Sequence, residues 1–482
     1  MQQRQREQEL RKRRKEAESI LHKYRASADG IPFGSASSRD SKNNTRGRWS
    51  LGTPTSENLD DPAKVNLQFH LDKEGEEKEE ITTLPKGSSP GGEEKKAEDQ
   101  DLVWLKKQEH RSSMLPPTPP SQMFMSPPDR IPPQVSSSES LLPETIWRDF
   151  ISSEEGAKFP PEPDRYHLYV SYACPGSHRA LIVRALKGLE KIISVTHVHP
   201  TWRLTNPKDP EDKHRGWVFG NPYGKEFSNT IGRGGPFPPA YHNTDPDPEF
   251  NAYSVRGIYE RAGDTSGKYT IPLIWDKKTK TIVNNESSDI AYMMNSCFND
   301  FAEDPLLDLY TEDDEDGRAR LNEVSEWLSP LMIHGVYRCG FAKNQVAYDH
   351  AISALCEAYD RADDILQSQR YLTGDTLTDA DIRLFVTLIR FDEVYSIYFK
   401  ANARLVLLTP SLLNFCREIY QIPGVAATCD MEQIKAHFFG SHAEWNKYSV
   451  IPRGLGFMEL LDMPHDRDEL TCRDEDDAGF IE

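Results

Sequence analysis

A single dipeptide, Cys174-Pro175, limits the folds open to this chain more than any other feature of its sequence. Residues 167–172, just before it, form a β-branched and aromatic run that predicts a strand. Residues 177–189, just after it, carry apolar side chains at helical spacing. Pro175 suits the first position of a helix, where its missing N–H is not needed. The sequence therefore predicts a strand that passes into a helix through a cysteine.

This position gives Cys174 a chemistry that an ordinary buried cysteine lacks. The unpaired N–H groups at a helix N-terminus favour a thiolate. A Cys-x-x-Cys redox motif would place a second thiol at position 177, where this chain has Ser177. No disulfide can form within the motif, so we expect attack on an external sulfur, giving a mixed disulfide that another thiol resolves. We interpret the cysteines without this context as small buried hydrophobes, namely Cys297, Cys339, Cys356, Cys416 and Cys429.

The elements around this junction have the order of a thioredoxin-like domain. We predict strands over 167–172, 192–198, 269–276 and 281–285, and helices over 177–189, 248–261 and 287–297. This βαβ unit, followed by a helix, a hairpin and a last helix, is the thioredoxin-like order. Strand patterns then stop, and we predict helices over 317–334, 343–368, 378–394, 410–421 and 430–438. The fold class is α/β plus all-α, with a thioredoxin-like domain over 141–300 and an all-helical domain over 305–455.

Two flanking segments and the overall composition exclude several classes of protein. Residues 1–140 are polar, charged and proline-rich, which predicts a disordered extension, and 456–482 predict a disordered acidic tail. The net charge of −19 argues against nucleic acid as a partner. No run of about 18 apolar residues predicts a membrane span. Seven cysteines and no secretory signal pattern suggest a cytoplasmic location, with organellar targeting left open.

Two further motifs of the first domain predict a ligand site beside Cys174. Pro272 starts a predicted strand, where thioredoxin-like folds place a cis-proline and where the backbone of the preceding residue, Ile271, pairs with a peptide-like ligand. Glu286 and Ser287 precede the next helix. A serine N-cap with free N–H groups can hold a ligand carboxylate. Simple helix capping is the alternative interpretation of this second motif. We find no metal-ligand spacing and no phosphate-binding loop.

A series of motifs resembles the glutathionyl-hydroquinone reductases, also called Xi-class glutathione transferases. The resemblance covers about residues 143–452. The motifs occur in order as Ala173-Cys174-Pro175 with His178-Arg179, Gly216-Trp217-Val218-Phe219, Ile271-Pro272-Leu273-Ile274-Trp275-Asp276, Ile282-Val283-Asn284-Asn285-Glu286-Ser287, Gly335-Val336-Tyr337 with Gly340-Phe341-Ala342, and Ile389-Arg390-Phe391-Asp392-Glu393-Val394-Tyr395. Each motif is weak alone, and the six in sequence are specific.

The resemblance implies an enzyme that uses glutathione as co-substrate, binds no metal or other cofactor, acts on small quinone-type conjugates and forms a homodimer. It implies Cys174 as nucleophile, with Tyr337 and Tyr395 lining the quinone pocket, where a phenol could protonate the departing ring. The glutathione-binding residues that it implies are Trp217, Lys268, Tyr269, Thr270, Ile271, Pro272, Glu286 and Ser287. For His178 we favour a structural role.

Two departures from the family pattern keep other functions open. The family usually has Cys-Pro-Trp-Ala, whereas this chain has Gly176 and Ser177, which we expect to widen the pocket beside the thiolate. Phe438 replaces the first tyrosine of a His-Tyr-Tyr pattern and removes one pocket hydroxyl. One alternative is an omega-like thioltransferase or dehydroascorbate reductase with the same cysteine. Another is a non-catalytic module, as in the gamma subunit of a translation elongation factor.

Overall fold

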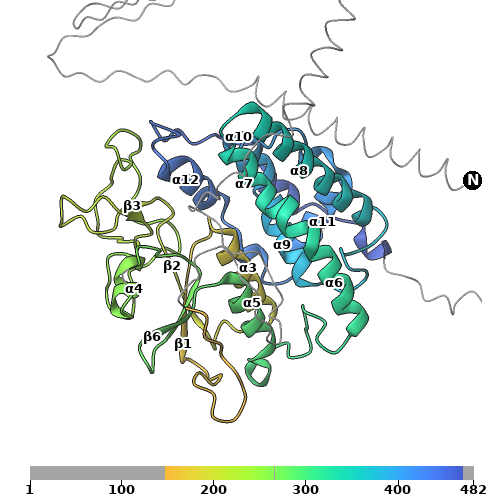
Figure 1. The fold of residues 1–482 in the computed structure, drawn as a ribbon, viewed down its shortest axis with the longest axis horizontal. Coiled ribbons are helices and arrows are strands. Elements are labelled where there is room, and N and C mark those ends of the chain that lie inside the picture. The colour runs from red at the N-terminus through yellow and green to blue at the C-terminus, as the bar shows by residue number, and fades with distance from the viewer. Residues whose placement is uncertain (1–146, 265, 471–482) are drawn as a thin grey trace, which may run out of the picture. The chain divides into compact units, whose positions relative to one another are not determined.

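The computed structural model describes residues 147–264 and 266–470, and Figure 1 shows the arrangement of their elements. The predicted disordered extension over 1–140 lies outside the described residues. The first part of the described chain contains β1 (Tyr166–Val170), α3 (Pro175–Leu186), β2 (Ser194–His197), β3 (Arg203–Leu204), β4 (Arg215–Gly216), α4 (Val255–Arg261), β5 (Leu273–Asp276), β6 (Thr281–Asn284) and α5 (Ser287–Ser296). The predicted order of strands and helices is confirmed.

Four of these strands form one mixed sheet in the order β2-β1-β5-β6. Strand β1 pairs parallel with β2 and antiparallel with β5, where Tyr169 lies opposite Leu273. Helix α4 lies on one side of the sheet, and α3 and α5 lie on the side that faces the helices (Figure 1). Strand β1 leads directly into α3. The start of α3 therefore lies at the end of the sheet where β1 finishes.

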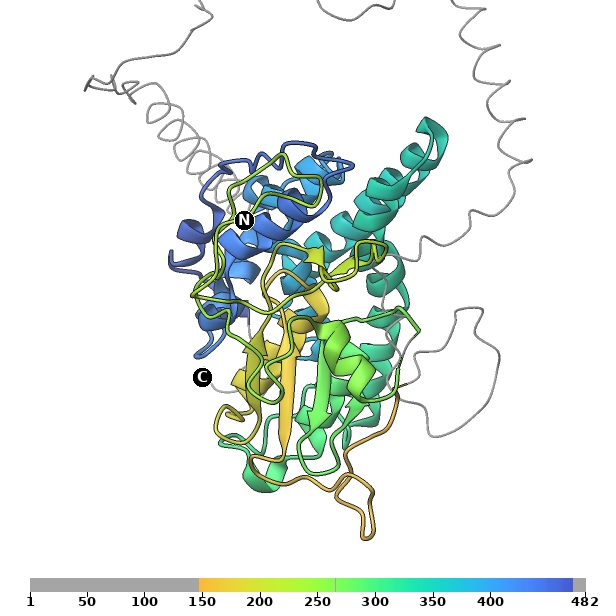
Figure 2. The ribbon, with the colours of Figure 1, turned by 90° about the vertical axis from the view of Figure 1, so that its left-hand side faces the viewer.

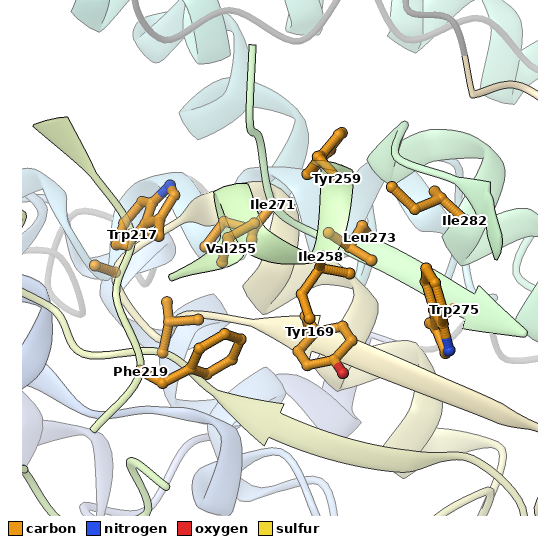
Figure 3. Packing of buried hydrophobic residues seen from close by; sticks show 12 residues of the cluster. Tyr169, Trp217, Phe219, Val255, Ile258, Tyr259, Ile271, Leu273, Trp275 and Ile282 are labelled. Atoms are coloured by element: carbon orange, nitrogen blue, oxygen red, sulfur yellow. The ribbon is translucent and has the colours of Figure 1, made fainter. Parts of the chain in front are cut away.

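A cluster of buried apolar side chains fills the space between the sheet and α4 (Figure 3). It includes Tyr169 from β1, Ile258 and Tyr259 from α4, and Leu273 and Trp275 from β5, each at most 1% exposed. Ile271 and Ala173 belong to the same cluster, and Cys174 packs against it. The core therefore fixes the backbone on both sides of the cysteine.

The second part of the chain is helical, as predicted. It contains α6 (Glu315–Trp327), α7 (His334–Phe341), α8 (Gln345–Leu366), α9 (Asp379–Leu388), α10 (Ser396–Tyr398), α11 (Pro410–Gln421), α12 (Met431–Ser441) and α13 (Phe457–Leu461). Turned by 90°, Figure 2 shows α8 rising beside the other helices. Thr378 is the N-cap residue of α9 and forms a capping box, in which the Asp381 carboxylate accepts from the Thr378 N–H.

Two predicted helices are interrupted. The predicted helix over 317–334 ends at Trp327 and continues as a π-helical segment, Leu328–Ile333, before α7. The predicted helix over 378–394 ends at Leu388, and a second π-helical segment, Phe391–Tyr395, follows. Apolar periodicity does not reveal such wider turns, which often occur at functional sites. The predicted helix over 248–261 is also shorter, since α4 starts only at Val255.

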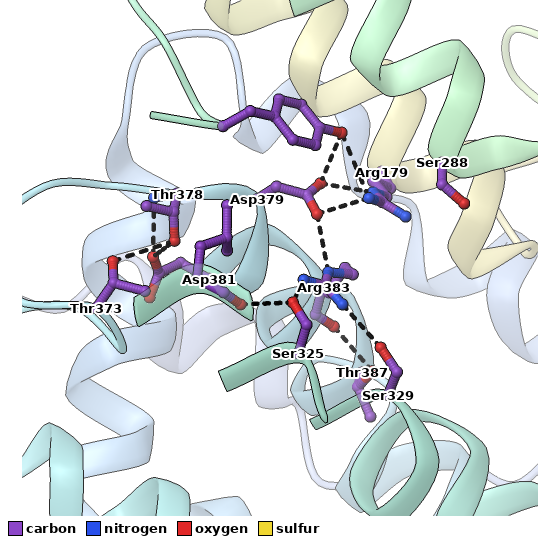
Figure 4. A network of polar contacts seen from close by, with 12 residues as sticks. Arg179, Ser288, Ser325, Ser329, Thr373, Thr378, Asp379, Asp381, Arg383 and Thr387 are labelled. Carbon is purple, nitrogen blue, oxygen red and sulfur yellow. Dashed lines mark hydrogen bonds and ion pairs between the residues drawn. The ribbon is translucent and has the colours of Figure 1, made fainter. Parts of the chain in front are cut away.

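A salt-bridge network joins the two parts of the chain (Figure 4). Arg179 from α3 donates two hydrogen bonds, both 2.6 Å long, to the Asp379 carboxylate at the start of α9. Arg383, one turn further along α9, pairs with the same carboxylate at 2.9 Å. All three side chains are buried. This network fixes α3, and therefore its N-terminus, against the helical part.

The prediction of a disordered acidic tail from residue 456 is wrong for its first part. Phe457 and Leu461 of α13 are each at most 1% exposed, and Arg467 is 1% exposed despite its charge. The Arg467 guanidinium pairs with the Glu418 carboxylate of α11 at 2.9 Å and donates to the Leu366 carbonyl of α8. The acidic composition of this segment predicted disorder, but Phe457 and Leu461 are buried and Arg467 forms a buried ion pair. Residues 471–482 lie outside the described residues.

Candidate active site

Cys174 is the N-cap residue of α3, with extended backbone angles and Pro175 as the next residue. Its backbone N–H donates to the Ser171 carbonyl at 3.2 Å, which holds the turn between β1 and the helix. The thiol is partly exposed, and its Sγ atom lies 3.6 Å from the carbonyl oxygen of Ile271. The predicted position at a helix N-terminus is confirmed, and the thiol lies beside the loop that leads into β5.

The peptide bond between Ile271 and Pro272 is cis, as the thioredoxin-like order predicted. The three residues before Ile271 form the segment that leads to this bond. Lys268 and Thr270 are exposed, and Tyr269 is half-buried. The Tyr269 ring packs against Tyr259 of α4 with a centroid distance of 5.5 Å. The Thr270 carbonyl accepts from the Tyr259 hydroxyl at 2.9 Å. Helix α4 thus supports the backbone that faces the thiol.

Glu286, and not a serine, is the N-cap residue of α5, so the predicted serine cap is wrong. Its carboxylate accepts from the Ser288 N–H at 3.4 Å and from the Ser287 and Ser288 hydroxyl groups at 3.4 and 3.2 Å. Both Glu286 and Ser287 are buried. An acidic side chain therefore already occupies the positive end of this helix, and it can also accept from a ligand amino group.

Gly176 does not leave open space beside the cysteine, which corrects the expectation of a wider pocket. A Cβ atom at this position would lie 3.0 Å from the Ser287 Cβ atom, 3.1 Å from its Oγ atom and 3.6 Å from the Pro272 Cδ atom. Ser287 and Pro272 therefore fill the direction of the missing side chain. The glycine brings the start of α3 close to both neighbouring elements of the site.

Trp217 lies directly after β4 and is 8% exposed. Its ring stacks on His437 of α12 with a centroid distance of 4.6 Å and an interplanar angle of 21°. The His437 Nδ1 atom lies 2.9 Å from the Pro200 carbonyl oxygen, and burial holds the pKa of this imidazole well below its usual value. A neutral histidine therefore backs the tryptophan ring, a support that the sequence alone did not indicate.

Tyr337 of α7 and Tyr395, the last residue of the second π-helical segment, lie together with ring centroids 5.9 Å apart. Both rings are buried, and burial is the main cause that raises the pKa of both phenols, that of Tyr337 far above its usual value. Their hydroxyl groups hydrogen-bond each other, and both interact electrostatically with Cys174. The structure thus brings the three predicted catalytic residues together, with both phenols in the proton-donating form.

An aromatic cavity adjoins this tyrosine pair, and its walls include residues that sequence reasoning missed. Its lining residues are Phe341, Tyr398, Phe399, Phe438, His442, Glu444 and Trp445. Phe399 connects it to Tyr337 at a centroid distance of 5.0 Å. The Tyr398 hydroxyl is buried and has no hydrogen-bond partner among the described residues. The dense aromatic spacing in 395–399 is the signal that could have revealed this wall.

A thioredoxin-like sheet whose first helix begins directly after Cys174, joined to an all-helical unit, is the architecture of a glutathione transferase. Residues 173–297 match the family model of the glutathione S-transferase N-terminal domain, and 345–410 match that of the C-terminal domain. The chain belongs to the glutathionyl-hydroquinone reductase family, the Xi class of these transferases. It is similar to the glutathionyl-hydroquinone reductase YqjG of Escherichia coli, with 39% identity over 64% of this chain and 84% of that one.

Other relatives are also glutathione transferases. The omega-like glutathione S-transferase 2 of Schizosaccharomyces pombe is 35% identical over 64% of this chain and 90% of its own length. The crystal structure of the Xi transferase of Phanerochaete chrysosporium is 41% identical, with a TM-score of 0.56 over 66% of this chain and 98% of that one. The glutathione-bound structure of YqjG is 36% identical, with a TM-score of 0.58 over 67% and 96%.

Proposed function

We propose that this protein reduces S-glutathionyl-hydroquinones to hydroquinones, with glutathione as co-substrate and Cys174 as nucleophile. The observation that carries the proposal is the single constellation of the Cys174 thiol, the Ile271 carbonyl 3.6 Å away and the neutral pair of Tyr337 and Tyr395. A nucleophile at a helix N-terminus and a proton donor in electrostatic contact with it are the two groups that this reaction requires. Relatives that carry this reaction in their names support it.

In the first step the Cys174 thiolate attacks the glutathione sulfur of the conjugate. The sulfur–sulfur bond forms, the bond between sulfur and the aromatic carbon breaks, and its electron pair stays with the ring. Tyr337, which is hydrogen-bonded to Tyr395, protonates that ring carbon. A second glutathione then attacks the mixed disulfide. Oxidised glutathione leaves, the Cys174 thiolate is restored, and the thiol proton of the second glutathione returns to the Tyr337 phenolate.

The glutathione moiety fits between the loop of Ile271 and the start of α5. We assign its backbone pairing to Ile271 and the approach residues Lys268, Tyr269 and Thr270, and its amino group to the buried Glu286 carboxylate, with Ser287 beside it. Trp217, stacked on His437, forms the wall next to this position. Among the described residues, no group of three histidines, cysteines or carboxylates is placed to hold a metal ion, and the scheme uses glutathione as its only co-substrate.

Turnover of a glutathionyl-hydroquinone by the purified full chain with excess glutathione tests this proposal. We expect robust turnover by the wild type, loss of it in Cys174→Ser, and retention in Cys297→Ser, which removes a half-buried thiol outside the site. Turnover of dehydroascorbate or a mixed disulfide, without turnover of the conjugate, would instead establish the omega-like thioltransferase. The relatives named omega-like make that the second candidate. No activity on any of the three would favour the non-catalytic module.

The oligomeric state and the cellular location remain predictions. The homodimer is expected from the family, and the cytoplasmic location from the cysteine pattern. Within residues 147–264 and 266–470, no helix is both long and apolar enough to cross a membrane.

A further inference from the structure

Arg390 lies between α9 and the second π-helical segment and is fully buried. Its guanidinium crosses to the other part of the chain, where Nη2 donates to the Tyr172 carbonyl at 2.7 Å and Nε lies 3.4 Å from the Ala173 carbonyl. These are the last two carbonyl groups before Cys174. The third contact, from Nη1 to the Val386 carbonyl at 2.6 Å, holds the guanidinium to its own helix.

The fourth contact of this guanidinium defines the state of His178. Arg390 Nη1 lies 3.1 Å from His178 Nδ1, and an arginine can only donate, so Nδ1 is the acceptor. His178 Nε2 then donates to the Thr428 hydroxyl at 2.9 Å, and that hydroxyl donates to the Val425 carbonyl at 2.6 Å. Burial and the neighbouring Arg390 charge hold the pKa of His178 well below its usual value, which agrees with this neutral tautomer.

Arg390 differs from the other fully or nearly fully buried arginines in having no carboxylate partner among the described residues. Arg165 pairs with Asp276, Arg179 with Asp379, and Arg467 with Glu418. Arg390 contacts only carbonyl oxygens and a neutral imidazole. A guanidinium stays charged in proteins, and a buried charge without a counter-ion costs several kcal/mol. The fold thus keeps a positive charge under the start of α3.

The titratable groups around this charge come from every neighbouring element. The electrostatic effect of Arg390 reaches His178 of α3, Tyr337 of α7, Tyr395 of the second π-helical segment, Cys429 just before α12, and His437 of α12. Burial favours the neutral form of each of them. The nearby acidic side chains are engaged elsewhere, Asp392 by the Val406 N–H and Glu393 by Lys435. No resident anion of the described chain therefore balances the charge.

We propose that Arg390 is a positioning residue that holds the Tyr172–Ala173 turn beneath Cys174 and supplies the fixed positive charge balanced by the thiolate of that cysteine. This inference deepens the proposed function, on which it rests for the role of Cys174 as nucleophile. The charge comes from the helical part of the chain, while the thiol belongs to the thioredoxin-like part. The nucleophile is therefore complete only when both parts are docked.

The test is the rate at which iodoacetamide alkylates Cys174 in the full chain between pH 5 and 9, followed by mass spectrometry of the Cys174 peptide. Alkylation needs no conjugate, so its outcome is independent of whether the proposed substrate is correct. For Arg390→Met we expect the pH midpoint to rise by about one unit or more, with alkylation at pH 7 slowed at least about tenfold. Arg390→Lys keeps the charge, and we expect a midpoint close to that of the wild type with a reduced kcat.

Arg184→Met is the matched control. Arg184 lies on α3, the helix that begins after Cys174, and like Arg390 it donates to backbone carbonyls, those of Ile193 and Glu190, but at the opposite end of α3 from the cysteine. We expect it to leave the midpoint unchanged. A folded Arg390→Met with the wild-type midpoint overturns the proposal. Arg390→Gln, which keeps donors without the charge, replaces the Met variant if that one does not fold. Failure of both neutral variants to fold also overturns it, because the charge would then serve folding itself.

Discussion

The Sγ atom of Cys174 lies 3.6 Å from the carbonyl oxygen of Ile271, across the gap between the start of α3 and the cis-proline loop. A disulfide-bound glutathione on this sulfur would lie along that loop. We predict that the full chain, treated with one equivalent of a glutathionyl-hydroquinone and no free glutathione, gains the mass of one glutathione on Cys174 alone. Cys297 should stay unmodified because burial raises the pKa of its thiol to about 12. Modification of several cysteines in peptide mapping would contradict a single nucleophile.

The tyrosine pair gives a second prediction, on proton transfer. Tyr337→Phe should lower kcat for a glutathionyl-hydroquinone by about 100-fold, the usual contribution of a general acid. Its effect on thiol–disulfide exchange should be small, since that step needs no protonation of carbon. Tyr398→Phe is the matched control, because it removes a hydroxyl of the same aromatic region that has no hydrogen-bond partner among residues 147–264 and 266–470. Equal losses in the two variants would show that ring packing, rather than a proton, is responsible.

The contact between Gly176 and Ser287 gives a third prediction. Gly176→Ala places a methyl group 3.0 Å from the Ser287 Cβ atom, so we expect it to destabilise the fold by about 1–3 kcal/mol. Ser287→Gly removes that atom. In a double-mutant cycle measured by urea unfolding, the alanine should cost less in the Ser287→Gly background. A strictly additive double variant would mean that the helix start moves freely to accept the methyl group.

The buried network at the junction of the two parts gives a fourth prediction. Asp379→Asn leaves Arg179 and Arg383 without their shared carboxylate, and we expect a loss of about 3–5 kcal/mol in the free energy of unfolding. Glu303→Gln breaks the pair with Lys191, in which both side chains are largely exposed, and should change it by less than about 1 kcal/mol. Similar losses in both variants would mean that the network is not a special support of α3.

Buried histidines give a fifth prediction, on pH. Burial lowers the pKa of His167, His197 and His199 to about 4, and holds those of His178 and His437 well below the usual value. Below about pH 6.5 these histidines bind protons in the unfolded chain but stay neutral in the folded chain. Their contribution to the free energy of unfolding is therefore complete above this pH and is lost as the pH falls toward 4. Each such histidine contributes up to about 1.4 kcal/mol per pH unit.

Two buried carboxyls oppose this trend, because burial raises the pKa of Asp381 and Asp392 to about 6 and the folded state then binds protons first. The five histidines outnumber them, so acid should destabilise the protein overall. Urea unfolding at pH 7.5, 6.5, 5.5 and 4.5 measures the slope. His197→Gln should make it shallower, and replacement of the exposed His350 by glutamine should not. A stability that rises on acidification would contradict this prediction.

Local patterns sufficed to predict much of the site. The strand, Cys174, Pro175 and helix follow one another in the chain, so their geometry depends on neighbours in sequence, and the cis bond before Pro272 follows from the thioredoxin-like order. Other features depend on residues far apart in the chain. The stack of Trp217 on His437 and the packing of Ser287 against Gly176 arise only from the docking of elements. The π-helical segment at Phe391–Tyr395 has ordinary helical periodicity, so its wider turn was not visible in the sequence.

The buried ion pair of Arg467 with Glu418 also sets where this protein can be cut. A truncation at residue 455, the predicted end of the helical domain, would remove the apolar anchors of α13 and leave Glu418 with Arg370 as its remaining ion-pair partner. Any excised catalytic unit should therefore extend through residue 470. Residues 456–470, although rich in charge, pack against α11. A tag or fusion partner should therefore follow residue 470.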